Sequence, residues 1–433
     1  MDRASDYGSE GCRFDSGRAH QAISEFCIYP LSLENLQWQS CFHNPTTFVD
    51  MTVGGDTLNA TQPVQTGQQR MGSLDGFRGI AIIAVLGFHL AESWPSVPRL
   101  IDPVSKGGFI GVDMFFVLSG FLITTLLLRE HQDSGKINFF RFFLRRKIRL
   151  MPPLLIFTLA ALIWAIKSGD NLYVFGATVI YSIFSVINWA LITKIEQSPH
   201  LGIIWSLSVE EQFYFLIAVI SLVHRWLVSK IGIDRFLVCL SCSLIIWSFC
   251  AKVLILHGGG IEDTWIQLYF RTDLRFDSFF IGVLASVYRK SKVEKPQKLI
   301  NWTFAPSMVF LGWYMWEVDN GDSWNYQGGL TAVAIASAFV IMAASYQGTF
   351  ANKIFSMRIL RSIGLVSYSV YLIHVLVFSA LSPANINMNN KVRLLLALMI
   401  IFGYAAIVYF AIEKPLSRVR ARLHVKPIGA KNR

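Results

Sequence analysis

Ionisable side chains stand inside long apolar runs of this sequence, where each costs about 2.5–3.5 kcal/mol to insert at the centre of a bilayer. Arg78 and His89 are 11 residues apart in the first run. At 100° per residue they share one face of a helix, about 16 Å apart along its axis, with Asp75 near the same stripe. An imidazole titrates near neutral pH and suits general-base chemistry. The structural alternative is an Asp–Arg pair at the helix end with a histidine at the far interface.

Two carboxylates in later apolar runs are candidates to orient this base. Asp113 stands near the start of the run 109–128, where a helix-dipole carboxylate is the plainer interpretation. Ser206, Glu210 and Tyr214 follow i, i+4, i+8 spacing and form one polar stripe. We expect Asp113 or Glu210 to hold His89 in one tautomer and to stabilise its conjugate acid.

A basic run precedes the third apolar segment. Arg141, Arg145 and Arg149 stand four residues apart and share a face if the run is helical, and Arg146 lies beside them. Guanidinium groups bind phosphate in a bidentate manner. The alternative is an ordinary basic loop on the cytoplasmic side of a membrane.

Further polar residues in apolar runs are candidates to line a pocket. They are Asp75, Ser119, Ser206, Gln212, Tyr214, Arg275, Asp277, Tyr371 and His374. An acyl-enzyme through His89 or Ser119 is less favoured, and no base stands at helical spacing from Ser119 to activate it. The sequence predicts no metal site.

The elements that must position these residues are transmembrane helices. Of the 433 residues 53% are hydrophobic and 15% are charged, against about 25% charged in soluble domains. Apolar segments long enough to approach the span of a bilayer recur throughout. They are 74–92, 109–128, 151–167, 172–193, 204–224, 236–256, 266–288, 302–317, 328–346, 362–380 and 393–411. The sequence predicts an all-α polytopic membrane bundle.

The basic loops set the expected topology. Lys and Arg gather in 129–150, 289–298, 347–361 and the tail, and basic loops stay on the cytoplasmic side. Eleven crossings would put the first two on opposite sides. Segment 172–193 is the weakest helix, so we expect ten spanning helices, both termini in the cytoplasm, and 172–193 as a re-entrant or interfacial piece.

Three regions follow from these patterns. Residues 1–70 form a polar, acidic leader without periodicity, which we expect to be disordered. It is untranslated if Met71 is the true start. Residues 71–415 form the membrane domain, and 416–433 a basic cytoplasmic tail. The net charge of +11 is typical of basic cytoplasmic loops, and the sequence predicts no nucleic-acid partner.

Several motifs together resemble the acyltransferase-3 family of integral-membrane O-acyltransferases. They run in the family's order from about residue 74 to 415. They are Leu-Asp-Gly-Phe-Arg-Gly at 74–79 with His89, Gly-Val-Asp-Met-Phe-Phe-Val-Leu-Ser-Gly-Phe-Leu-Ile at 111–123, Arg-Arg-Lys-Ile-Arg-Leu-Met-Pro at 145–152, Trp-Ser-Leu-Ser-Val-Glu-Glu-Gln-Phe-Tyr at 205–214, Arg-Phe-Asp at 275–277, Ser-Tyr-Ser-Val-Tyr-Leu-Ile-His at 367–374 and Ile-Glu-Lys-Pro at 412–415. The resemblance implies transfer of an acyl group from acyl-CoA to a hydroxyl of a carbohydrate, lipid-linked glycan or macrolide.

The resemblance agrees with the residues. Acyl-CoA, with acetyl-CoA the expected form, is a cytosolic polyanion, and the basic run with Arg78 would bind its phosphates. His89 would then be the general base, with no permanently bound cofactor. We expect a protein of the bacterial cytoplasmic membrane, surrounded by lipid, without the hydrolase-like SGNH domain that some members carry. The competing class is a proton-coupled transporter or flippase, because intramembrane carboxylates and histidines also form proton relays.

Overall fold

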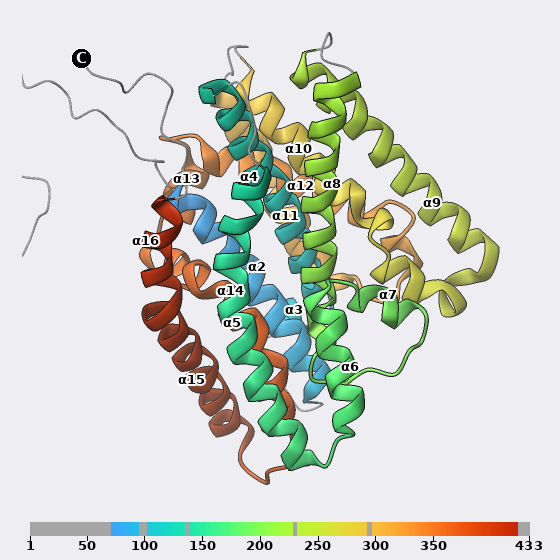
Figure 1. Ribbon diagram of the computed structural model, residues 1–433, viewed down its shortest axis with the longest axis vertical. Coiled ribbons are helices and arrows are strands. Elements are labelled where there is room, and N and C mark those ends of the chain that lie inside the picture. The colour runs from blue at the N-terminus through green and yellow to red at the C-terminus, as the bar shows by residue number, and fades with distance from the viewer. Residues whose placement is uncertain (1–70, 95–101, 135–138, 228–231, 292–296, 423–433) are drawn as a thin grey trace, which may run out of the picture. The chain divides into compact units, whose positions relative to one another are not determined.

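The computed structural model describes residues 71–94, 102–134, 139–227, 232–291 and 297–422 (Figure 1). All regular secondary structure in these ranges is helical. The expectations for the leader 1–70, and for the end of the tail beyond residue 422, lie outside the described residues.

Seven helices in the described ranges are long and apolar enough to cross a membrane. Their cores are α2 (Gly72–Ser93), α4 (Gly111–Ser134), α5 (Phe139–Ser168), α8 (Trp205–Leu227), α9 (Ile233–Phe270), α14 (Arg358–Ala380) and α15 (Asn390–Val408). A π-helical turn, Tyr409–Glu413, joins the last of them to α16 (Lys414–Arg422). The predicted all-α polytopic membrane bundle is confirmed.

Three of the ten expected spans do not reach that length or apolarity. They correspond to α10 (Phe276–Lys290), α11 (Gln297–Glu317) and α12 (Gly329–Ser345). α10 and α12 are short but have largely buried side chains, so neighbouring helices surround them. The expectation of one helix over 266–288 is wrong. α9 ends at Phe270 and the chain turns through η4 (Asp273–Arg275) before α10, because polar residues occupy the turn.

The segment 172–193 does not form a spanning helix, as expected. It divides into α6 (Leu172–Ile183) and α7 (Ile187–Ile192), with Ser185 at φ 58° between them. At 1.5 Å per residue α6 is about 18 Å long, well short of the ~30 Å hydrocarbon core. The Gln212 amide of α8 donates to the Ser185 carbonyl at 2.6 Å and so holds the break in place.

The basic run is helical, and the expectation of a loop over 129–150 is wrong. α4 continues to Ser134, and α5 begins at Phe139 and passes through Pro152 and Pro153 without ending. Arginine, leucine and lysine before the prolines favour helix. The arginines therefore project from fixed positions on the first turns of α5.

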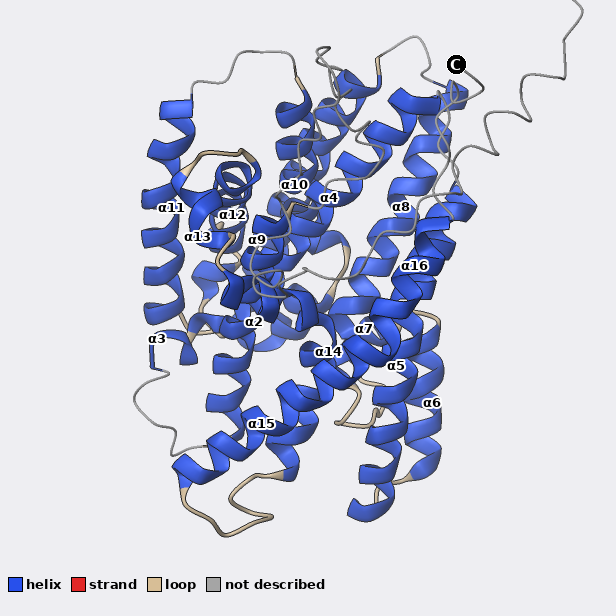
Figure 2. Cartoon of the chain, turned by 90° about the vertical axis from the view of Figure 1, so that its left-hand side faces the viewer, coloured by secondary structure: helices blue, strands red, loops and turns tan. Residues whose placement is uncertain are grey.

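α2 and α14 pack backbone to backbone near the middle of the bundle (Figure 2). A Cβ added at Gly364 would lie 1.6 Å from the Asp75 carbonyl oxygen, and one at Gly79 would lie 2.4 Å from that of Leu360. Glycine at these positions allows the close approach. It places the side chains of α14 directly against the face of α2 that carries Arg78 and His89.

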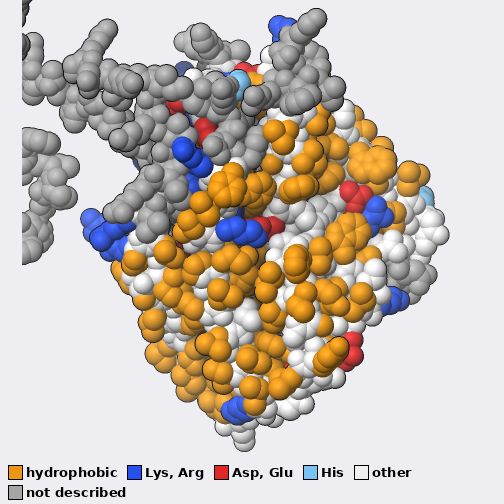
Figure 3. Space-filling model, viewed as in Figure 1, with side chains coloured by type: hydrophobic (Ala, Val, Ile, Leu, Met, Phe, Trp, Pro, Cys, Tyr) orange, Lys and Arg blue, Asp and Glu red, His pale blue; other side chains and the backbone are white. Residues whose placement is uncertain are grey.

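The outside of the bundle is apolar. Hydrophobic side chains cover much of the lower part of the face in Figure 3. On α5, Leu155, Leu159 and Ile163 are more than half exposed and stand four residues apart. Such a stripe suits contact with lipid. The remaining short elements are α3 (Asp102–Ser105), η2 (Gly107–Ile110), η3 (Gly202–Ile204), η5 (Ser323–Asn325) and α13 (Phe350–Phe355).

The close approach of α2 and α14 makes a testable prediction. Gly364→Ala should lower stability by about 1–3 kcal/mol, because its methyl group meets backbone that cannot move aside. Gly403→Ala on α15 is the control, since nothing lies within 4 Å of its added Cβ. Thermal unfolding in detergent measures both. A Gly364→Ala protein as stable as the wild type would contradict the tight contact.

Candidate active site

A pocket of about 80 Å³ opens between α2, α4, α5, α8 and α14. Arg78, Arg146 and Arg149 line it, and the carboxylate of Glu210 faces them. Hydroxyl-bearing residues complete the polar wall: Ser119, Ser206, Ser367, Tyr368 and Tyr371. Apolar side chains of α4, α5 and α8 form the remainder. The pocket thus combines a concentration of positive charge with an apolar wall, which suits an anion carrying an apolar arm.

Glu210 organises the floor of this pocket. Arg146 Nη2 lies 2.6 Å from Glu210 Oε1, and the hydroxyls of Ser119 and Tyr214 donate to the same oxygen. The guanidinium also lies over the Tyr214 ring, 3.6 Å from its centroid. Arg146 is therefore held in one orientation at the pocket wall. The expected polar stripe of Glu210 and Tyr214 is present, and it serves this arginine.

The expected donor-binding arginines divide into two groups. Arg146 and Arg149 line the pocket with Arg78, whose Nη1 lies 3.0 Å from Asp75 Oδ1. Arg145 instead pairs with Glu130 of α4 at 3.2 Å. Arg141 is exposed at the start of α5 and does not line the pocket. The three arginines at i, i+4, i+8 thus do not act as one face, since a carboxylate on α4 engages the middle one.

His89 lies at the opposite end of α2 from Arg78. Its Nδ1 is 2.8 Å from Glu92 Oε2, one helical turn further on, and its side chain is 24% exposed. The ring of His374 on α14 packs against it, with ring centroids 5.2 Å apart. Glu92 was not identified from the sequence, although its i, i+3 spacing from His89 was a usable signal.

The expected contact of His89 with Asp113 or Glu210 is wrong. Asp113 Oδ1 accepts from Arg275 Nη1 at 3.1 Å and from the Ser278 hydroxyl at 2.9 Å. Glu210 is engaged by Arg146. A buried carboxylate is better satisfied by a guanidinium and further donors than by an imidazole at the edge of the bundle.

Aromatic rings connect the pocket with His89. The Tyr371 hydroxyl stands 2.6 Å from the Ser206 hydroxyl in the pocket wall. The Tyr371 ring lies 5.6 Å from that of His374, and His374 lies 5.2 Å from His89. On α2, Arg78 and His89 are about 16 Å apart along the axis. The cationic pocket and the imidazole are thus two ends of one region along α2 and α14.

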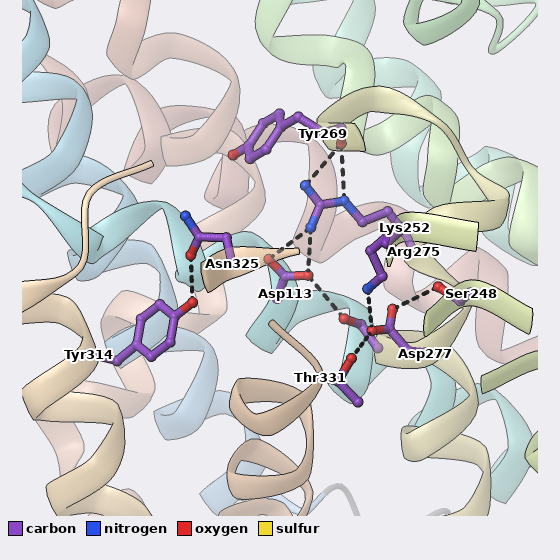
Figure 4. A network of polar contacts seen from close by, with 10 residues as sticks. Asp113, Ser248, Lys252, Tyr269, Arg275, Asp277, Tyr314, Asn325 and Thr331 are labelled. Atoms are coloured by element: carbon purple, nitrogen blue, oxygen red, sulfur yellow. Dashed lines mark hydrogen bonds and ion pairs between the residues drawn. The ribbon is translucent and has the colours of Figure 1, made fainter. Parts of the chain in front are cut away.

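Arg275 and Asp277 belong to a separate buried network and do not line the pocket (Figure 4). Arg275 donates to Asp113 and to the Tyr269 carbonyl. Asp277 Oδ2 is 2.5 Å from Lys252 Nζ on α9 and accepts from Thr331 at 2.6 Å. The Lys252 side chain is only 2% exposed.

Lys252 is a buried structural residue that was not identified from the sequence, although a lone lysine in an apolar run was the available signal. Gln212 also lies away from the pocket, where it bonds to the α6–α7 break and to Thr272. Both residues tie helices together.

Comparison with known proteins identifies the family. The family model of the acyltransferase domain matches residues 71–412 of this sequence, and the chain belongs to the acyltransferase-3 family. It is similar to the peptidoglycan O-acetyltransferase OatA of Listeria monocytogenes, with 30% identity over 362 residues, 80% of this chain and 56% of the relative. A Staphylococcus aureus protein named provisionally as an O-acetyltransferase is 32% identical over 324 residues, 71% of this chain and 51% of the relative. The chain thus spans about half the length of the curated relatives it matches. No solved structure matches.

The buried network predicts a specific pattern of stability. Lys252→Met should cost about 3–5 kcal/mol, because Asp277 is left as a buried charge without its cation. Adding Asp277→Asn removes that charge and should recover most of the loss. Thermal unfolding in detergent over the double-mutant cycle measures the coupling. A double variant as unstable as the single variant would show that the pair is not coupled.

Proposed function

We propose that this chain transfers an acyl group, acetyl in the simplest case, from acyl-CoA to a hydroxyl of a carbohydrate, lipid-linked glycan or macrolide-type acceptor. The observation that supports this most directly is the arrangement along α2. A pocket with three arginines lies at one end, His89 lies at the other, and Tyr371 and His374 stand between them. The family and the names of the relatives agree with such a reaction.

The donor would bind with its phosphates at Arg146, Arg149 and Arg78. Coenzyme A is made in the cytosol, so this end of the bundle faces the cytoplasm and both termini lie on that side. The pantetheine arm would extend along α2 toward His374, over the distance of about 16 Å that separates Arg78 from His89. The apolar wall of the pocket suits that arm, and an anionic phosphate would compete with Glu210 for Arg146.

His89 would act as the general base. The acceptor O–H proton passes to the imidazole while the oxygen attacks the thioester carbonyl carbon. The tetrahedral intermediate collapses with cleavage of the C–S bond. The thiolate takes the proton back from the imidazolium, leaving free coenzyme A and the O-acyl ester. Asp113 and Glu210 are not placed to assist this transfer directly.

The acceptor would enter from the side opposite the arginines. His89 is 24% exposed at that end, so a large acceptor can reach it without crossing the bundle. In a bacterial cytoplasmic membrane that side meets the cell envelope. The Listeria relative is named a peptidoglycan O-acetyltransferase, which favours a glycan acceptor for this chain.

The role of His89 has a direct test. Purified protein in proteoliposomes receives acetyl-CoA and glycan acceptors, and free coenzyme A is measured. His89→Ala should lower the rate at least about a hundredfold, the contribution expected of a general base. Acetyl-CoA binding, followed by calorimetry, should be unchanged. Acceptor movement across the membrane without thioester consumption would indicate a transporter instead.

The arginines of the pocket give a second prediction. Arg146→Gln with Arg149→Gln should weaken acetyl-CoA binding about tenfold or more, because two charge-assisted contacts to phosphate are lost. Arg145→Gln is the matched control, since its partner is Glu130 and it does not line the pocket. Calorimetry with acetyl-CoA measures all three proteins. Equal affinity in the double variant and the control would remove the phosphate assignment.

A further inference from the structure

Glu92 fixes the hydrogen-bonding state of His89. Its Oε2 lies 2.8 Å from His89 Nδ1, and an ionised carboxylate can only accept a hydrogen bond. The hydrogen therefore resides on Nδ1. A neutral His89 ring then carries its lone pair on Nε2, the nitrogen that can receive a proton from an alcohol.

The neighbouring His374 does not hydrogen-bond to His89 and so does not fix its tautomer. Its Nδ1 is 2.7 Å from the Tyr371 carbonyl oxygen, which also can only accept. Its Nε2 is buried and has no hydrogen-bond partner among the described residues. His374 thus presents a neutral ring to His89. On α4, the helix beside them, Asp113 is turned to Arg275. Among the described residues, the ionisable groups in contact with His89 are Glu92 on its own helix and His374 on α14.

The position of Glu92 is unfavourable for its own helix. It stands in the last turn of α2, where backbone carbonyls carry partial negative charge and acidic residues are disfavoured. No basic residue stands in that turn. A carboxylate there is compensated when it pairs with an imidazolium, which the helix end also stabilises.

We propose that Glu92 is the positioning residue of the His89 base, an assignment that rests on the proposed function. It keeps the Nδ1–H tautomer, holds the ring at the outer end of α2, and stabilises the imidazolium while the proton is on Nε2. The carboxylate is 53% exposed, so solvent screens it and its effect is moderate. It does not touch the donor pocket.

Peptide-resolved labelling with diethylpyrocarbonate tests this without an acceptor. The reagent modifies neutral imidazole, so the labelling rate of His89 against pH reports its ionisation in the full chain in detergent. Glu92→Gln removes the charge that stabilises the imidazolium. The pH profile of His89 labelling should then differ from that of the wild type, because the ring loses the carboxylate that faces its Nδ1. Glu92→Asp should keep the midpoint near that of the wild type.

Glu317→Gln is the matched control, because Glu317 is an exposed carboxylate at the end of α11. It should leave the midpoint unchanged. A Glu92→Gln midpoint equal to that of the wild type would overturn the assignment.

Activity separates this inference from the proposed function. With acetyl-CoA and chitotetraose as the probe acceptor, Glu92→Gln should lower kcat about tenfold and leave the KM for acetyl-CoA unchanged. A wild-type protein that consumes no acetyl-CoA would overturn the proposed function while the labelling result still stood, and a fully active His89→Ala protein would overturn the role of His89 as base. An inactive His89→Ala protein with an unaltered Glu92→Gln labelling profile would overturn the role of Glu92 alone.

Discussion

Charges inside an apolar bundle must be paired, and this constraint determines which helices lie together. The Glu210–Arg146 pair joins α8 to α5, while the Asp113–Arg275 pair fixes α4 to the turn before α10. Lys252 and Asp277 fasten α9, whose surface is largely exposed, to the interior. Each pair forms because the low-dielectric surroundings make an unpaired charge costly. These charges form two clusters, one around Glu210 and Arg146 and one around Asp113 and Arg275. Both clusters contact α4, and neither includes His89.

The separation of these clusters gives the site its two ends. Arginines gather where α5 enters the bundle, and the fixed geometry of Arg146 against Glu210 and Tyr214 keeps one of them at the pocket wall. The close glycine contact of α2 with α14 brings His374 against His89 at the far end. One rigid pair of helices therefore spans both the anion-binding end and the imidazole. In the proposed reaction, this geometry would allow a donor from one side of the membrane to meet an acceptor from the other.

The sequence predicted the features that arise locally. Apolar length predicted the all-α membrane bundle, helical spacing predicted that Arg78 and His89 share α2, and weak apolarity predicted that 172–193 does not span. The partners across the bundle could not be predicted this way. Asp113 and Arg275 are 162 residues apart, and only the packing of α4 on α10 brings them together. The turn within 266–288 was missed because it is set by the same charge pairs, and Arg145 was misassigned because Glu130 lies on a different helix.

The central claim is that the arginine pocket and His89 are two ends of one reaction path. An experimental structure of the protein with a non-hydrolysable acetyl-CoA analogue tests it most directly. The account predicts phosphate density at Arg146 and Arg149, with the pantetheine arm running along α2 and its acyl carbon beside His374 and His89. An analogue bound elsewhere, or one whose acyl end points away from His89, would contradict it.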